Sequence, residues 1–346
     1  MTVALVSQPV GVRQANLADD RERARIDAFV AGKPESTPFH LAGWSAAVAR
    51  ATGNRSRYLV AERANGAITG VLPLTEMRSR LFGRALVSTG FGVDGGVLGD
   101  GVEALASGAW ELAGRLGCPE VELRGGLLPE GWAVDEHSYL GFVRPLAGDE
   151  AAELASIPRK QRAEVRRALG FDLEVSVGRD LGEHYRVYAE SVHNLGTPVF
   201  PARLLREVST GIDSDALTVR HRGRAVASVL SLYWQGTVYP YWGGGTVEAR
   251  ALRANDMMYF ALMNHARRRG CTRFDFGRSK TGTGAAAFKK NWGFEPVVRR
   301  YAKRSDGPAR EVNPLNPKYA LMVRTWKRLP LPIATQLGPW IARGLG

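Results

Sequence analysis

A short segment in the second half of the chain holds the residues best suited to chemistry. Phe288, Lys289 and Lys290 follow the glycine-rich stretch Gly282-Thr283-Gly284. A lysine held in a short helix there could offset negative charge that develops on an oxygen during a reaction, or hold a phosphate of a ligand. A pair of surface lysines beside a core phenylalanine and tryptophan would give the same pattern, so the lysine pair alone is a weak signal.

A carboxylate precedes this segment. In the predicted strand Thr272–Phe276, alternation places Phe274 and Phe276 on one face and Asp275 on the other. A carboxylate at the end of a strand can accept the proton of an attacking amine, or it can form an ion pair with a flanking arginine. The sequence leaves both roles open.

Three further donors follow the same strand. Arg278, Ser279 and Lys280 are predicted to leave it into a loop that contains Gly282 and Gly284. Donor side chains beside glycines suit an anionic ligand. They form the second candidate site.

Positive charge is concentrated in two segments of a chain whose net charge is +13. Residues 158–169 hold five basic residues and one acidic residue. A helix there would place Arg159, Arg162 and Arg166 on one face, with Lys160 on a neighbouring stripe. Like charges stacked in this way repel, and an anionic partner such as tRNA, a nucleotide-linked sugar or coenzyme A would remove that cost.

The second basic segment is residues 299–346, with ten basic residues against two acidic ones. Ile333, Leu337, Trp340 and Ile341 follow one another there at helical spacing. This stripe could lie on an anionic membrane, or it could pack against the rest of the protein. Pro339 argues against one long helix.

Composition excludes several classes of protein. The 346 residues are 45% hydrophobic and 23% charged, which is ordinary for a globular protein and excludes a disordered or fibrous one. Two cysteines cannot build a disulfide framework or a four-thiolate zinc site, and we expect no metal site. No secretory signal or membrane-spanning stretch is visible, so we expect a cytoplasmic protein. Nor is there a G-x-S-x-G nucleophile motif, and Cys271 fits a buried small side chain better than a nucleophile.

The order of predicted elements repeats along the chain. Each half reads helix, antiparallel strands, glycine-rich turn, helix and strand, and the second helix of each half ends at Gly117-Cys118 or Gly270-Cys271. We therefore predict one α/β unit over 1–150, a second over 151–310 that carries the active site, and a basic helical extension over 311–346. Residues 1–24 are predicted to be a loosely attached arm, and Gly90–Gly96 a loop whose backbone approaches another segment closely.

This order resembles the GNAT acyltransferase fold, and the segment 241–294 resembles the FemAB/FemX family of tandem-GNAT aminoacyltransferases. The matching features are a Gly-rich turn at 243–245, Asn255 near a helix start, Asp275-Phe276-Gly277, and the run FKKNWGF at 288–294. The resemblance implies an α/β (α+β) fold of two GNAT-like domains, whose mixed, mostly antiparallel sheets are flanked by helices. Segments 72–92, 159–168, 194–201 and 275–284 are more narrowly similar to FemAB-like proteins of exosortase/PEP-CTERM gene clusters.

The resemblance also implies roles for named residues. A lysine of the F-K-K motif would lie at the substrate, and by position Lys289 is favoured over Lys290. The catalytic candidates are these two lysines and Asp275, the last from its place at a strand end. Substrate-binding candidates are Arg159, Lys160, Arg162, Arg166, Asn194, Thr197, Tyr241, Asn255, Arg278, Ser279, Lys280 and Phe288.

The resemblance implies an enzyme that forms an amide on an amino group of a cell-envelope or exopolysaccharide-related precursor. It implies no permanently bound cofactor, and the donor would be aminoacyl-tRNA or acyl-CoA. Residues 250–255 (RALRAN) depart from the R/Q-x-x-G-x-G/A loop with which GNAT enzymes bind coenzyme A, which weighs against that donor. The alternatives are an acyl-CoA-dependent N-acyltransferase and a non-catalytic RNA- or membrane-binding module. A peripheral contact with the inner membrane face through the C-terminus is compatible with an enzyme and with a binding module. The oligomeric state stays open.

Overall fold

The computed structural model describes residues 11–79, 81–307 and 317–346, and the chain divides into two compact units. Unit 1 comprises residues 1–135, 300–311 and 344–346, and unit 2 comprises residues 136–299 and 312–343. This division differs from the predicted boundary at 150/151 and from a separate extension over 311–346. The reason is strand pairing between distant segments, because β9 (Ala133–Pro145) pairs with β14 (Arg273–Lys280) and residues 301–305 pair with residues 120–124.

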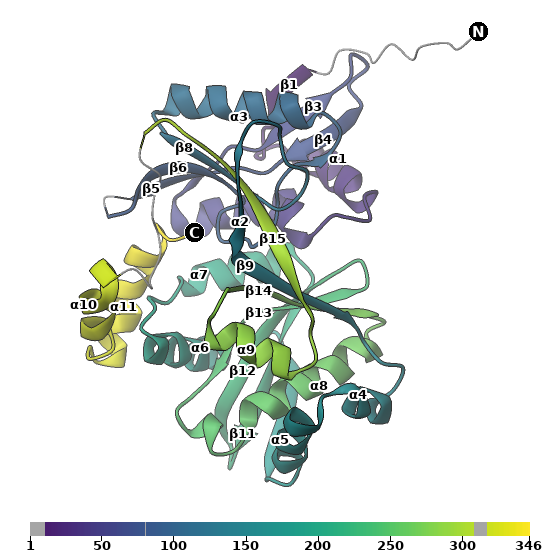
Figure 1. The fold of residues 1–346 in the computed structure, drawn as a ribbon, viewed down its shortest axis with the longest axis vertical. Coiled ribbons are helices and arrows are strands. Elements are labelled where there is room, and N and C mark those ends of the chain that lie inside the picture. Colours follow the sequence, from purple (N-terminus) through teal and green to yellow (C-terminus); the bar gives the residue numbers. More distant parts are fainter. Residues whose placement is uncertain (1–10, 80, 308–316) are drawn as a thin grey trace. The chain divides into compact units, whose positions relative to one another are not determined.

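Unit 1 contains two sheets with helices around them (Figure 1). Its elements in chain order are β1 (Gly11–Gln14), α1 (Asp20–Ala31), η1 (Pro38–His40), α2 (Ala42–Thr52), β2 (Arg55–Ser56), β3 (Leu59–Glu62), β4 (Ile68–Leu72), β5 (Thr75–Ser79), β6 (Gly83–Ser88), β7 (Leu98–Gly99), α3 (Val102–Leu116), β8 (Glu120–Arg124) and the end of β15 (Pro296–Ser305). The order β1-β3-β4-β7 is antiparallel throughout. In the other sheet β6 runs parallel to β8, and the other pairs within the unit are antiparallel.

Unit 2 is built around the sheet order β10-β11-β12-β13-β14-β9. Its elements in chain order are most of β9, α4 (Glu150–Ser156), α5 (Arg159–Leu169), β10 (Leu173–Gly178), α6 (Gly182–Leu195), α7 (Ala202–Gly211), β11 (Ser214–His221), β12 (Arg224–Trp234), β13 (Thr237–Gly245), η2 (Glu248–Arg250), α8 (Ala254–Arg268), β14, α9 (Gly284–Asn291), the start of β15, α10 (Pro317–Trp326) and α11 (Leu331–Ala342). Only β13 and β14 are parallel neighbours here. No helix in the described part of the chain combines the length and apolar character needed to cross a bilayer.

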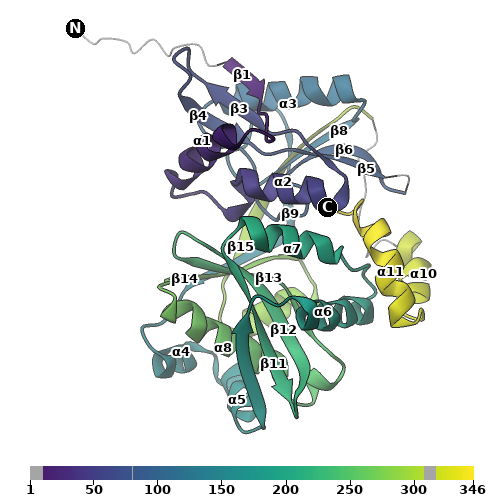
Figure 2. The same ribbon diagram turned by 180° about the vertical axis from the view of Figure 1, so that it is seen from behind.

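Helices cover both faces of the unit 2 sheet (Figures 1 and 2). Consecutive strand residues point to opposite faces. A Cβ placed on Gly244 would collide with Ser191 of α6, whereas one on Gly245 would lie 2.8 Å from Asn255 Oδ1 of α8. The glycines of β13 therefore let α6 and α8 approach the strand from opposite sides.

The duplicated helix ends predicted from the sequence have the same geometry in both units. α3 precedes β8, which runs parallel to β6, and α8 precedes β14, which runs parallel to β13. Gly117 and Gly270 both have left-handed backbones, with φ of 64° and 84°. The amide of Cys118 donates to Ala113 O at 2.9 Å, and that of Cys271 donates to Ala266 O at 3.0 Å. Both cysteines are buried, as expected for small core side chains.

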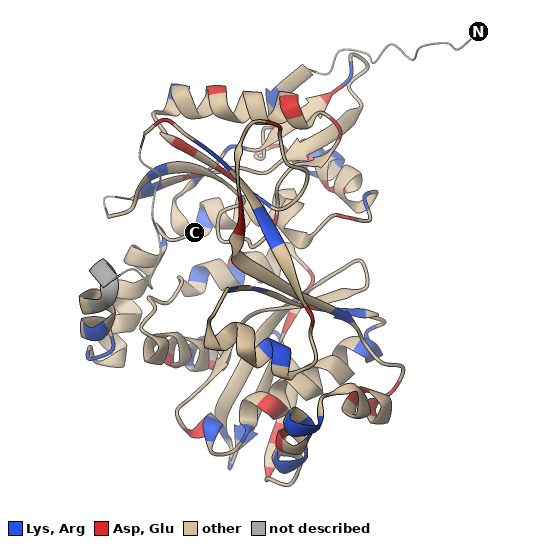
Figure 3. Ribbon diagram, in the orientation of Figure 1, with Lys and Arg blue, Asp and Glu red and all other residues tan. Residues whose placement is uncertain are grey.

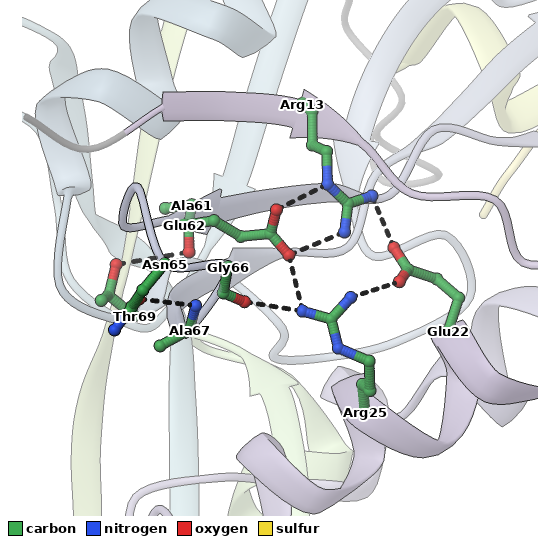
Figure 4. Close-up of polar contacts among 9 residues, drawn as sticks. All are labelled: Arg13, Glu22, Arg25, Ala61, Glu62, Asn65, Gly66, Ala67 and Thr69. Atoms are coloured by element: carbon green, nitrogen blue, oxygen red, sulfur yellow. Dashed lines mark hydrogen bonds and ion pairs between the residues drawn. The ribbon is translucent and has the colours of Figure 1, made fainter.

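The N-terminal segment is not the loose arm predicted over residues 1–24. Residues 11–14 form β1, which pairs with β3, and α1 begins at Asp20. The Arg13 guanidinium bridges Glu62 at 2.7 Å and Glu22 at 2.6 Å, and Arg25 binds the same two carboxylates (Figure 4). The polar composition of this segment wrongly predicted a loose arm, because its charged side chains form ion pairs with residues up to 49 positions away in the chain. Residues 1–10 lie outside the described residues.

The predicted close approach of the Gly90–Gly96 loop is confirmed. Gly96 N donates to Arg124 O at 3.0 Å, and a Cβ on Gly96 would collide with the carbonyl oxygen of Gly125.

Substituting this glycine should destabilise unit 1. Gly96→Ala forces backbone to move, and we expect it to lower the free energy of unfolding by about 1–3 kcal/mol or more. Gly114→Ala in α3 is the matched control, because its added Cβ meets nothing within 4 Å, and it should raise stability by about 0.5–1 kcal/mol. Urea unfolding followed by circular dichroism measures both, and shifts of the same sign would contradict the close approach.

Candidate active site of unit 2

The site begins where the parallel ladder of β13 and β14 ends. These strands pair through Thr237 with Arg273 and through Val238 with Phe274. Beyond that point β14 continues beside β9, and the register shifts between Asp275 and Arg278. This irregularity turns main-chain carbonyls of β14 out of the ladder. Main-chain carbonyls of β14 between Asp275 and Arg278 can therefore bind a side chain.

Lys289 binds these carbonyls. Its Nζ donates to Arg278 O at 2.9 Å and to Gly277 O at 3.4 Å. The ammonium also lies 5.4 Å from the ring centroid of Phe142 and 5.6 Å from that of Phe276. The side chain is therefore held between β9 and β14 rather than extended into solvent.

The position of α9 follows from its first turn. Thr283 is the N-cap, and its hydroxyl accepts a hydrogen bond from the amide of Ala286. Phe288 packs against Tyr259 and Trp292, with centroid distances of 5.7 and 6.3 Å. Consecutive helix residues point in different directions, so this anchoring turns Lys289 inward and leaves Lys290 exposed.

Burial changes the electrostatics of this lysine. Burial lowers the pKa of Lys289 to about 8, Asp275 partly opposes that shift, and the positive charges of Arg278 and Arg299 add to it. The side chain thus carries an ammonium whose proton is more easily lost than that of an ordinary lysine.

Asp275 is the carboxylate of the site. Phe274 and Phe276 pack in the core, as alternation predicted, while Asp275 Oδ1 accepts a hydrogen bond from Gly277 N at 2.8 Å. Burial raises the pKa of Asp275, and Arg299 partly opposes this, with its guanidinium 3.5 Å from Oδ2. The resulting carboxylate is a stronger proton acceptor than an exposed one.

Sequence reasoning missed Arg299. The arginines considered for Asp275 were its neighbours in the chain, but the ion pair is with a residue of β15. A Cβ on Gly141 of β9 would lie within the Arg299 guanidinium, so glycine leaves the space that this side chain occupies. Only strand pairing brings these residues together, and no local pattern signals it.

Arg278, Ser279 and Lys280 do not form the predicted loop cluster. β14 extends through Lys280, so the three residues alternate along a strand. Arg278 and Lys280 lie 4.4 and 5.9 Å from the ring centroid of Tyr139. Ser279 is buried on the other face, and its Oγ forms no hydrogen bond with the described residues.

A pocket of about 460 Å³ lies at the start of α8. It is lined by Gln161, Glu164, Ala249, Arg250, Arg253, Asn255, Asp256, Phe288 and Asn291. Two predicted residues, Asn255 and Phe288, are therefore brought together here. The Asn255 side chain approaches Gly245 of β13, and its Oδ1 forms no hydrogen bond with the described residues.

The charges of this pocket are mixed. Arg253 Nε lies 2.5 Å from Glu164 Oε2, and Gln161 Nε2 donates to Asp256 Oδ1 at 2.5 Å. Burial raises the pKa of Asp256. Arg253 also has a left-handed backbone, with φ of 53°, a conformation that glycine adopts more readily. The loop thus follows a glycine-like path while carrying a large cation and lying beside two carboxyl groups.

The basic residues of α5 lie on its solvent side. Arg159, Lys160 and Arg166 are exposed, and Arg162 is half-buried with its Nε donating to Ile157 O at 3.1 Å. Figure 3 shows the basic residues along this helix. The pocket beside α8 is lined instead by Gln161 and Glu164 of α5. The predicted basic face exists, but it does not line that pocket.

Three other candidates do not line the pocket at α8. Asn194 and Thr197 are exposed at the C-terminal end of α6, where the amide of Thr197 donates to Val192 O at 2.9 Å. Tyr241 is the extra residue of a bulge, because Leu230 pairs with Trp242 and Ser231 pairs with Pro240. The bulge therefore interrupts the regular alternation that would place Tyr239 and Tyr241 on one face of β13.

A second pocket, of about 790 Å³, was not predicted. It lies among the start of α6, α7 and β11, and its lining includes Arg179, Tyr185, Arg206, Ser214 and Asp215. Asp215 accepts hydrogen bonds from Tyr233 at 2.7 Å and from His265 and Arg269 at 2.8 Å. No short motif contains these residues, so the sequence offered no signal for the pocket.

Comparison with known proteins agrees with this geometry. Residues 155–290, which lie in unit 2, match the family described as acetyltransferase (GNAT) domain, in agreement with a GNAT fold in this part of the chain. No curated protein matches the sequence.

Solved structures match most of the chain at low identity. FemX is 15% identical with a TM-score of 0.63, covering 84% of this chain and 96% of FemX. The C-terminal domain of a putative lysylphosphatidylglycerol synthetase from Agrobacterium fabrum is 13% identical with a TM-score of 0.56, covering 84% and 93%. A tandem GNAT protein from the clavulanic acid biosynthesis pathway is 16% identical with a TM-score of 0.54, covering 87% and 100%. The predicted tandem GNAT fold is confirmed.

The charge environment of Lys289 can be tested by titration. Because Asp275 raises the pKa of Lys289 and Arg299 lowers it, Asp275→Asn should move the midpoint below about 8 and Arg299→Met should move it upward. NMR of ¹³C-methylated lysines measures these midpoints, and Lys289→Gln assigns the signal. Shifts of the same sign in the two variants would contradict the arrangement.

Proposed function

We propose that this protein is a FemAB-like acyl- or aminoacyltransferase that forms an amide on an amino group of a cell-envelope or exopolysaccharide-related precursor. The observation that carries the proposal is the partly buried Lys289 ammonium beside Asp275, at the point where β13 and β14 stop pairing. Similarity to proteins of exosortase/PEP-CTERM clusters motivates the acceptor class, and a cytoplasmic location goes with it.

The reaction joins an amine to an acyl carbon. The nitrogen attacks the carbonyl, a C–N bond forms, and the bond from the acyl carbon to the leaving oxygen or sulfur breaks. Negative charge that develops on the carbonyl oxygen is stabilised by the Lys289 ammonium and by main-chain N–H groups where the strands part. Asp275 accepts the proton that the amine loses, and burial, by raising its pKa, makes it a better base.

An anionic donor or acceptor gains affinity from the basic face of α5. Arg159, Lys160 and Arg166 are exposed and carry the positive charge that attracts phosphates. Of the remaining candidates, Arg278 and Lys280 of β14 and Tyr241 of β13 would offer further polar groups to a substrate. Asn255 and Phe288 belong to the pocket at α8.

The structure favours a donor other than coenzyme A. A pyrophosphate at the start of α8 would meet Glu164 and Asp256, and carboxylates repel phosphates. The Arg253 and Asn255 side chains also occupy a loop where GNAT enzymes carry small residues. Aminoacyl-tRNA is accordingly the proposed donor, and acyl-CoA is the second candidate because residues 155–290 match the acetyltransferase family.

Replacing the two neighbouring lysines separates catalysis from surface charge. Lys289→Met should lower kcat for acyl transfer about 100- to 1000-fold, the size expected for the loss of one oxyanion stabiliser. Lys290→Met removes the same charge from an exposed position and should leave kcat within about twofold. The assay follows amide product by mass spectrometry. Equal activity of both variants contradicts the role of Lys289, and product from neither variant nor the native protein favours the non-catalytic alternative.

The pH dependence gives an independent prediction. The protonated form of Lys289 is the active form, so kcat should fall as pH rises through about 8. An ordinary lysine would keep its proton to about pH 10. A rate that stays constant from pH 7 to 9.5 contradicts the electrostatic role.

Calorimetry discriminates the donors. Coenzyme A should bind weakly or not at all to the native protein, whereas Glu164→Gln together with Asp256→Asn should strengthen its binding by removing the carboxylates. Saturable binding of coenzyme A by the native protein that Arg250→Gln weakens would contradict the proposed donor preference, because Arg250 lines the same pocket.

A further inference from the structure

The last helix of the chain packs through its small residues. Ala334, Gly338 and Ala342 are spaced four apart in α11, and all three are buried. A Cβ on Gly338 would lie 2.9 Å from the amide nitrogen of Val199, in the segment that follows α6. The fully buried residues of α11 are thus all small.

Three large apolar residues of α11 are exposed, whereas Leu331 and Ile341 are half-buried. Ile333, Leu337 and Trp340 follow one stripe at i, i+4 and i+7, and their exposed fractions are 45%, 48% and 56%. A helix that packs on a core normally buries its large residues. The sequence-based alternative that this stripe packs against the protein is therefore wrong, and the predicted break at Pro339 is also absent, because α11 runs through it.

The neighbouring helix adds to this surface. In α10, Leu321 and Met322 are also exposed. Residues 317–346 contain five basic residues and no acidic residue. Of these, Arg324, Lys327 and Arg328 are exposed. The Arg343 guanidinium lies 6.0 Å from the ring centroid of Trp340, so positive charge borders the apolar stripe directly.

We infer that the exposed face of α10 and α11 binds the surface of a bilayer that contains anionic lipid. Leucine, isoleucine and tryptophan would enter the boundary between headgroups and acyl chains, and the surrounding cations would bind lipid phosphates. Charge selects this occupant over a second copy of the chain, because a symmetric dimer would bring two surfaces without acidic residues against each other. The inference concerns location and does not depend on the proposed acyl transfer.

Vesicle flotation with the full-length protein tests this inference. The native protein should float with vesicles of phosphatidylcholine and phosphatidylglycerol, less with phosphatidylcholine alone, and less as salt rises. The combined variant Ile333→Gln, Leu337→Gln and Trp340→Gln should weaken binding at least about tenfold. The control Leu127→Gln changes a residue of unit 1 that is 51% exposed and should bind like the native protein.

Two results would overturn the inference. The first is flotation of the combined variant equal to that of the native protein, or no flotation of either. The second is a native dimer, seen by light scattering without vesicles, that the combined variant converts to monomer, because the face would then belong to a second copy. Circular dichroism checks that the combined variant is folded. If the combined variant is unfolded, the single variant Trp340→Gln is tested in its place, and we expect it to lose less binding.

Discussion

The candidate active site depends on the burial of one ammonium group. Removing a lysine charge from water costs several kcal/mol unless polar partners surround it. Here the partners are two carbonyls that β14 exposes at its irregularity, the faces of two aromatic rings, and the nearby carboxylate of Asp275. The bulge, the capped start of α9 and the aromatic contacts of Phe288 are all needed to hold Nζ there. The result is a cation with unused hydrogen-bonding capacity and a lowered pKa, which is what electrostatic catalysis requires.

The two units use a similar arrangement of helix and strand differently. In unit 1, Glu122 of β8 binds Arg124 at 2.6 Å and Lys303 at 2.9 Å. Burial would raise the pKa of Glu122, but these two cations outweigh it and hold that pKa well below its usual range. The charges on β8 are thus matched within the unit and serve stability. In unit 2, by contrast, Lys289 of α9 binds neutral carbonyls of β14. Its positive charge therefore stays available for a substrate.

Positive charge in unit 2 occurs on two surfaces of different character. The basic face of α5 is polar and suits soluble anions, whereas the cations of α10 and α11 border large exposed apolar side chains. Between α5 and α8 the charge is mixed, because Glu164 and Asp256 lie among the arginines. An overall net charge of +13 therefore conceals distinct local environments, and only the local ones bear on substrates and membranes.

The sequence by itself determined the features that depend on neighbouring residues. Strand alternation placed Asp275 opposite its two phenylalanines, and the repeated Gly-Cys helix ends indicated two copies of one unit. Glycine content marked the loop at 90–96. These succeed because backbone periodicity and glycine conformation act over a few residues. Tertiary structure alone decided that Asp275 pairs with Arg299, which carbonyls hold Lys289, the lysine already favoured over Lys290, and that α11 buries its small residues. Each of these depends on which distant strand or helix supplies the opposing surface, and strand register and packing set that choice over separations that local patterns do not encode.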